Sequence, residues 1–181
     1  MKNRVFLAAK LDVEALAHDG ASLEGQWPAV ELTRLSDAAA QEAPASGWPD
    51  VRWSLEGEER ARRGAEPEVW LHLSAEAEVQ LTCQRCLRPV HEHLQLERSI
   101  LFVRSEDEAE SLDPDSEDDV LALPRHLNAK ELIEDELLLA LPLVPRHDVC
   151  PKPLTAPTQE LEEPLEEKPN PFAALQALKK R

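Results

Sequence analysis

Two pairs of residues in this 181-residue sequence have the types and spacing that bind a metal ion. Cys83 and Cys86 form a CxxC pair, and His147 and Cys150 form a second pair with the same two-residue gap. Zinc is often held by four such thiolate and imidazole ligands in a tetrahedron, with each pair supplied by one turn of the chain. The sequence therefore contains a candidate zinc site, although a long stretch of chain separates its two halves.

Other interpretations of the CxxC pair stay open. His91 and His93 are alternative ligands, but their i, i+2 spacing places them on the outer face of a strand. The two cysteines could equally remain reduced and pack under a turn as small apolar groups. A thioredoxin-like redox pair ranks behind both, because such a pair begins a helix whose dipole lowers the thiol pKa, whereas Pro89 and a strand follow here.

The sequence carries no recognisable catalytic motif. GxGxxG, P-loop, GxSxG and HExxH patterns are absent, and five glycines are too few for a phosphate cradle. Glu134, Asp135 and Glu136 are consecutive in a predicted helix, so they point in different directions and do not form a catalytic pair. We interpret them as helix surface or as an acidic rim for a basic partner, and we expect a non-enzymatic protein without catalytic residues.

The charge balance restricts the partners. The 36 acidic residues outnumber the 20 basic ones, and the formal net charge is −16. Affinity for phosphate comes from Lys and Arg, so a general grip on RNA or DNA is disfavoured and a basic protein is the more natural partner. The simpler explanation is an acidic surface that only maintains solubility. The alternative route to RNA is a local patch of Arg60, Arg62 and Arg63 near Trp53 or Trp70.

Nothing in the sequence predicts a membrane or secreted protein. No apolar run approaches the roughly 18 residues that span a bilayer, and the first residues lead into a mixed segment instead of a signal-peptide apolar region. Three cysteines are an odd number that suits a reducing compartment. We therefore expect a cytoplasmic protein with no structural disulfide and no membrane partner.

The clearest structural pattern is a long antiparallel β-hairpin over residues 69–103. Apolar residues alternate with polar ones before the CxxC turn and again after Pro89, which is the period of half-buried strands. Arg98 interrupts the apolar stripe of the returning strand. With a further strand at residues 51–55 and weaker strands at 1–10 and 21–27, the pattern predicts an α+β fold whose sheet is strongly curved and approaches a barrel.

Helices and loops complete the predicted domain. Asp12 caps a short helix that ends near Gly20, and Pro28 opens a second short helix. Residues 105–119 are strongly acidic and contain Pro114, so we expect a disordered loop there. Asn128 caps a helix over about residues 129–141, which packs on the sheet.

Three segments follow from these patterns. Residues 1–150 form one α+β domain, and residues 151–169 form a disordered, acidic, Pro-rich linker. Residues 170–181 form a short amphipathic helix with Phe172, Leu175 and Leu178 on its apolar face. That helix either docks on a groove of a partner or folds back onto its own domain.

Three stretches of this sequence together resemble the bacterial YceD family of large ribosomal RNA subunit accumulation proteins. They are the CxxC turn at 83–86, the helix and following segment at 131–148, and the terminal segment at 168–175. The resemblance extends over most of the chain from residue 1, with residues 41–50 and 105–119 matching least.

The resemblance implies a cytoplasmic, non-enzymatic factor that supports the synthesis, processing or stability of 23S ribosomal RNA. It also implies contact with a large-subunit ribosomal protein or a pre-ribosomal particle, and hence with 23S ribosomal RNA directly or indirectly. Related sequences carry further cysteines after the long helix, whereas this chain has only His147 and Cys150 there.

Overall fold

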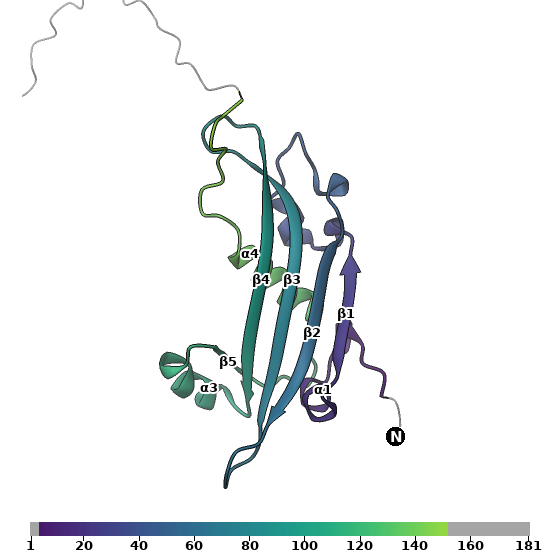
Figure 1. Cartoon of the computed structure of the whole chain (residues 1–181), viewed down its shortest axis with the longest axis vertical. Helices are drawn as coiled ribbons and strands as arrows, with labels where there is room; N and C mark the ends of the chain where they lie inside the picture. Colours follow the sequence, from purple (N-terminus) through teal and green to yellow (C-terminus); the bar gives the residue numbers. More distant parts are fainter. Residues whose placement is uncertain (1–3, 152–181) are drawn as a thin grey trace, which may run out of the picture.

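A long hairpin dominates the fold, as Figure 1 shows. The computed structural model describes residues 4–151. Its five strands follow one another in the sheet in sequence order: β1 Ser22–Trp27, β2 Val51–Arg60, β3 Glu68–Thr82, β4 Pro89–Val103 and β5 Asp119–Ala122. The first four are antiparallel, and β5 runs parallel to β4 at residues 100–103 only.

The hairpin predicted over residues 69–103 is confirmed. β3 and β4 pair without interruption from Val69 opposite Phe102 to Thr82 opposite Pro89. One face of β3 is buried and the other is half-exposed, because successive side chains of a strand point to opposite faces. The sheet is open, with β1 and β5 at its edges, so closure towards a barrel is not confirmed.

Helices cover one face of the sheet. The helices of the described residues are α1 Val13–Asp19, α2 Thr33–Asp37, α3 Glu106–Leu112 and α4 Ala129–Leu139, with single 3₁₀ turns at Ala8–Lys10, Ala29–Glu31, Ala45–Gly47 and Asp113–Asp115. α1 packs on β2 and β3, α4 packs on β3 and β4, and α2 packs on α4. The opposite face carries the polar side chains of β2, β3 and β4. No helix in residues 4–151 is long and apolar enough to cross a membrane.

The N-terminal elements are set by local signals. Asp12 accepts a hydrogen bond from the Ala15 amide at the start of α1, and Gly20 ends the helix in the left-handed conformation, as predicted. β1 is also confirmed, and the single helix expected after Pro28 is confirmed in part, because Pro28 begins a 3₁₀ turn and the α-helix starts only at Thr33. The edge strand expected within residues 1–10 is wrong for the described part, where residues 8–10 form a 3₁₀ turn.

The disordered loop expected at residues 105–119 is wrong as well. Ser105 caps α3 by accepting a hydrogen bond from the Glu108 amide, and acidic residues in the first turn stabilise the positive end of the helix dipole. Ala109 and Val120 are buried, which fastens α3 and β5 to the sheet. Acidic composition suggested disorder, but these local capping and packing interactions outweigh it.

The core lies between the sheet and α1, α2 and α4. Its fully buried side chains include Leu55, Leu71, Ile100, Ile133 and Leu137. The helix expected at 129–141 is confirmed, with Asn128 as its cap. Apart from Pro151, the predicted linker and C-terminal helix lie outside the described residues, so the domain boundary near residue 150 stays a prediction.

Candidate metal centre

The four predicted metal ligands meet at the tip of the hairpin. One ligand atom each from Cys83, Cys86, His147 and Cys150 lies within 4.8 Å of the others. The Sγ atoms of Cys83 and Cys150 are 4.0 Å apart, and Cys86 Sγ is 3.5 Å from His147 Nδ1. Zn–S bonds of about 2.3 Å and Zn–N bonds of about 2.05 Å give tetrahedral edges of about 3.8 Å and about 3.6 Å. The four residues therefore lie close enough to bind a metal.

The β3–β4 turn positions the first half of the cluster. The amide of Cys83 donates to the Arg88 carbonyl, and the amide of Leu87 donates to the Cys83 carbonyl, at 2.9 Å in each case. Leu87 adopts a positive φ of 56°, which turns the backbone sharply after Cys86. Both cysteine side chains consequently point to the same side of the turn.

The segment after α4 brings the second half. It runs alongside the hairpin to its tip, as Figure 1 shows, where the Gln84 amide donates to the Pro145 carbonyl at 2.9 Å. This bond places His147 and Cys150 beside the CxxC turn. Only the packing of α4 on the sheet makes this approach possible, since the two halves are far apart in the sequence.

The chemistry of the cluster suits a soft metal ion. All three cysteines are buried and free, and their sulfur atoms with one imidazole nitrogen form a donor set typical of zinc and unlike the oxygen sets of Mg²⁺ or Ca²⁺. Burial alone would raise the pKa of the Cys83 thiol, but hydrogen bonds from the Cys86, His147 and Arg85 amides lower it overall. Burial and the neighbouring sulfurs raise the pKa of Cys150.

The alternative ligands lie elsewhere. His91 and His93 point from the outer face of β4 and contact Glu78, with His91 Nε2 at 2.6 Å and His93 Nδ1 at 2.8 Å from its carboxylate oxygens. Neither histidine belongs to the four-residue cluster that residues 4–151 contain.

The acidic residues of α4 are largely used within the chain. Glu134 is 6% exposed and accepts hydrogen bonds from the amides of Arg34 and Leu35. Glu136 is 8% exposed and its Oε2 lies 3.2 Å from Arg98 Nε, which explains why a charged residue interrupts the apolar stripe of β4. Asp135 is exposed and pairs with Arg34. Binding of a partner by these three residues stays a prediction, and only Asp135 faces solvent.

Two of the three arginines considered for RNA make contacts within the chain, whereas Arg63 is exposed in the turn between β2 and β3. Arg60 lies over the ring of Trp70, 4.3 Å from its centroid, and pairs with Glu58 at 2.8 Å. Arg62 is 3.5 Å from Glu68. Trp53 lies inside the core, stacked on Trp27. Neither of the two tryptophans offers a bare ring face to a base, and Phe172, Leu175 and Leu178 lie outside the described residues.

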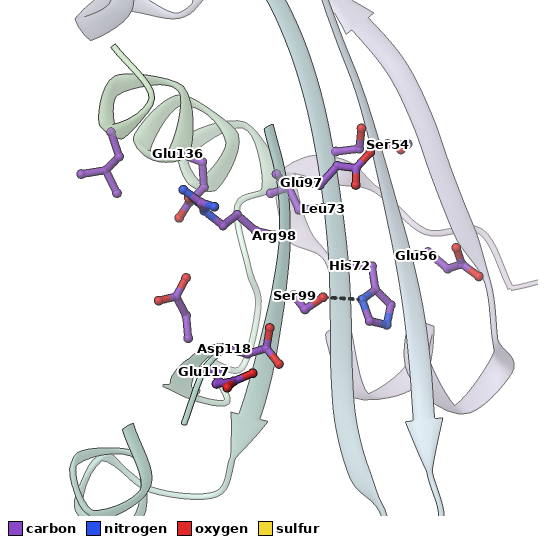
Figure 2. Close-up of a pocket in the computed structure, with 13 residues that line it drawn as sticks. Ser54, Glu56, His72, Leu73, Glu97, Arg98, Ser99, Glu117, Asp118 and Glu136 are labelled. Atoms are coloured by element: carbon purple, nitrogen blue, oxygen red, sulfur yellow. Dashed lines mark hydrogen bonds and ion pairs between the residues drawn. The ribbon is translucent and has the colours of Figure 1, made fainter. Parts of the chain in front are cut away.

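The structure contains a groove beside β4 that the sequence did not predict. It lies where β2, β3 and β4 meet the start of β5 and the end of α4, and Figure 2 shows acidic side chains approaching it from β2, β4, α4 and the segment before β5. Three of its acidic residues, Glu117, Asp118 and Asp119, are consecutive in the sequence. We expected them in a disordered loop, and a disordered loop gives no reason to place them beside β4.

Comparison with known proteins identifies the family. The family model described as large ribosomal RNA subunit accumulation protein YceD matches residues 71–179, which is more than half of the chain. The chain belongs to the YceD family. The matched part begins within β3 and contains the rest of the hairpin, α4 and all four residues of the metal cluster. The wider resemblance expected from residue 1 is not covered by this match.

A curated member of the YceD family supports the assignment. The large ribosomal RNA subunit accumulation protein YceD of Haemophilus influenzae (strain ATCC 51907 / DSM 11121 / KW20 / Rd) is 37% identical over 107 residues. The aligned part covers 58% of this chain and 62% of that relative. No solved structure matches the chain.

Proposed function

We propose that this chain is a non-enzymatic, cytoplasmic ribosome-biogenesis factor that supports the synthesis, processing or stability of large-subunit 23S ribosomal RNA. Membership of the YceD family carries the proposal, because both the family and the relative are named for accumulation of the large ribosomal RNA subunit. The relative matches over part of its length only, so its role comes to this chain as a proposal.

The direct partner in this proposal is a large-subunit ribosomal protein or an assembly intermediate. The net charge of −16 favours a basic protein over bare phosphate. Arg60 and Arg62, which could have contacted RNA, already pair with Glu58 and Glu68. Contact with 23S ribosomal RNA is therefore indirect in the proposal, through the protein or particle to which the factor binds.

Gradient sedimentation of lysate from growing cells tests the function. At low salt, the chain should co-sediment with large-subunit precursors, and added salt should release it, because charge attraction between exposed groups is screened. Free migration at low salt would refute the proposal. Mass spectrometry of co-purifying proteins, compared between the full chain and a chain cut at Pro169, would name the partner and test the role of Phe172, Leu175 and Leu178.

The alternative of direct RNA binding makes a different prediction. Reversing the charge of Arg60, Arg62 and Arg63 together should then abolish crosslinking to ribosomal RNA. An unchanged crosslink would count against the arginine patch. The main proposal expects co-sedimentation with precursors to survive these changes.

We also propose that Cys83, Cys86, His147 and Cys150 bind zinc in a structural role. Four protein ligands leave no open position for a substrate, which is the mark of a structural site. The ion would tie the segment after α4 to the hairpin tip and so stabilise the approach that the Gln84–Pro145 bond already makes.

Metal analysis of protein purified without chelator or metal-affinity tag tests this site. The wild-type chain should carry about one zinc per molecule. Cys83→Ser and His147→Ala should lose the metal, whereas His93→Ala, which alters the alternative ligand on the outer face, should keep it. Wild-type protein without metal, or full occupancy in Cys83→Ser, would favour reduced cysteines packed under the turn.

A further inference from the structure

Within residues 4–151, the edge of β4 that precedes residue 100 has no strand partner on the side of β5. β5 pairs with β4 only at residues 100–103, so the preceding residues of β4 have no strand neighbour on that side within residues 4–151. The register between β3 and β4 is continuous, without a bulge. A long regular edge of this kind exposes a row of backbone donors and acceptors that can pair with another chain.

The direction of these backbone groups follows from one hydrogen bond. The Val103 carbonyl accepts from the Leu123 amide at 2.7 Å, on the side of β4 that faces away from β3. Backbone groups of a strand alternate in direction, so those of His93, Gln95 and Glu97 face the same side. Within residues 4–151, the backbone groups of His93, Gln95 and Glu97 make no hydrogen bond to a turn, a loop or a helix end.

An acidic groove continues this edge. It has a volume of about 660 Å³ and extends from β2 and β3 across the middle of β4 to α4 and the start of β5 (Figure 2). Its carboxylates are those of Glu56, Glu97, Glu117, Asp118, Asp119 and Glu136. The groove contains one arginine, Arg98, which is paired with Glu136, and one histidine, His72, which contacts Glu58 and Ser99.

We propose that the free edge of β4, residues 91–99, binds an extended Lys- and Arg-rich segment of a partner protein as an added strand. Backbone pairing would supply affinity, and the groove carboxylates other than Glu136, which is buried and paired with Arg98, would select positive side chains. This inference rests on the proposed function, because it names the surface that receives the basic partner.

Charge argues against other occupants of this edge. A second copy of the chain would bring another net charge of −16 to the same surface. Bare nucleic acid would place phosphates beside six carboxylates. The simplest alternative is that the charged side chains only prevent edge-to-edge association, as they do in many proteins.

Peptide binding to the full-length chain tests the proposal. The probe is a fluorescent twelve-residue peptide in which Lys alternates with Thr and Val, and fluorescence anisotropy at low salt measures its Kd. A second peptide with the same charge carries an N-methyl group on every residue, so it cannot donate backbone hydrogen bonds along either edge. The first peptide should bind at least about tenfold more tightly, since several hydrogen bonds are lost in the second.

Matched variants locate the site. Gln95→Pro removes an outward-facing amide donor at a position where an edge strand tolerates proline, and Gln95→Ala keeps that donor. We expect Gln95→Pro to weaken binding by about tenfold or more and Gln95→Ala to leave it unchanged. Glu97→Lys should also weaken binding, whereas Glu24→Lys on β1, the opposite edge strand, should not.

Each other outcome overturns the proposal. Equal binding of the two peptides, or equal effects of Gln95→Pro and Gln95→Ala, would show charge attraction without strand addition. If neither peptide binds, the charged side chains only prevent edge-to-edge association. A dimer of wild-type protein in sedimentation equilibrium, lost in Gln95→Pro, would make the edge an interface between copies. If Gln95→Pro does not fold, the N-methylated peptide and Glu97→Lys still decide.

Failure of this inference is distinguishable from failure of the proposed function. If Gln95→Pro folds and still co-sediments with large-subunit precursors, the biogenesis role stands and the edge is not its contact. If the wild-type chain binds the peptide but migrates freely in the gradient, the edge proposal stands and the biogenesis role falls.

Discussion

Glu134 joins α4 to α2, and its replacement by alanine should destabilise the protein strongly. Its Oε1 lies 2.7 Å from the amide nitrogen of Arg34 and 3.2 Å from that of Leu35, at the start of α2. Leu35 is fully buried, so water cannot replace the lost acceptor there. Glu134→Ala would therefore leave a buried donor without a partner.

The magnitude follows from those two amides. A buried donor that loses its acceptor costs about 1–3 kcal/mol, and the amide of Arg34 is only partly buried, so we expect a loss of about 2–4 kcal/mol. The ion pair with the Arg34 side chain is left out of this sum, because that side chain is half-exposed. For a domain of this size, each kcal/mol lowers Tm by about 2–4 °C, so the loss corresponds to about 4–16 °C.

Urea and thermal unfolding, followed by circular dichroism, measure the effect. Glu134→Gln keeps an acceptor oxygen and should retain most of the stability. Asp135→Ala removes the exposed neighbour that pairs with the same arginine and should change stability by no more than about 0.5 kcal/mol. If Glu134→Ala and Asp135→Ala lose the same amount of stability, the reasoning is refuted. The hydrogen bonds from the two amides, which only Glu134 accepts, would then contribute nothing to stability.

Three further predictions concern the core and the outer face. Gly57→Ala should destabilise by roughly 2 kcal/mol or more, because a Cβ there would lie 2.6 Å from the backbone of α1, whereas Gly47→Ala has open space; unfolding of the pair measures the difference. Ile133→Ala should cost about 2–5 kcal/mol in urea unfolding, because the side chain is fully buried beneath the sheet. Hydrogen bonding to Arg60 lowers the pKa of Glu58 from 4.5 to about 2. The charged carboxylate therefore stabilises the fold above pH 4.5, and this contribution is lost as the pH falls towards 2. Glu58→Gln should make the decline of Tm over that pH range less steep, as thermal unfolding at a series of pH values would measure.

Local patterns were enough to predict the central elements. Alternation of buried and exposed side chains identifies β3 and β4, because a half-buried strand repeats every two residues. Asp12 and Asn128 mark the starts of α1 and α4, because a capping side chain bonds to amides within its own turn. These signals act over a few residues and can be interpreted without knowledge of the fold.

Features that depend on distant contacts were missed or misjudged. Arg98 looked like a break in an apolar stripe until its partner Glu136, 38 positions later, appeared beside it. The segment 105–119 looked disordered by composition, yet Ala109 and Val120 are buried against elements that composition does not describe. Burial of an individual residue depends on which elements meet, and the local sequence does not carry that information.

The sequence by itself determined the residue types and spacing of both halves of the metal cluster, the acidic charge and the family resemblance. Only the tertiary structure decided that Cys83 and Cys86 meet His147 and Cys150, and that Glu134 and Glu136 are buried inside the domain. The physical reason is that spacing along the chain sets which side chains share a turn or a face. The packing of α4 on the sheet sets which distant segments come together.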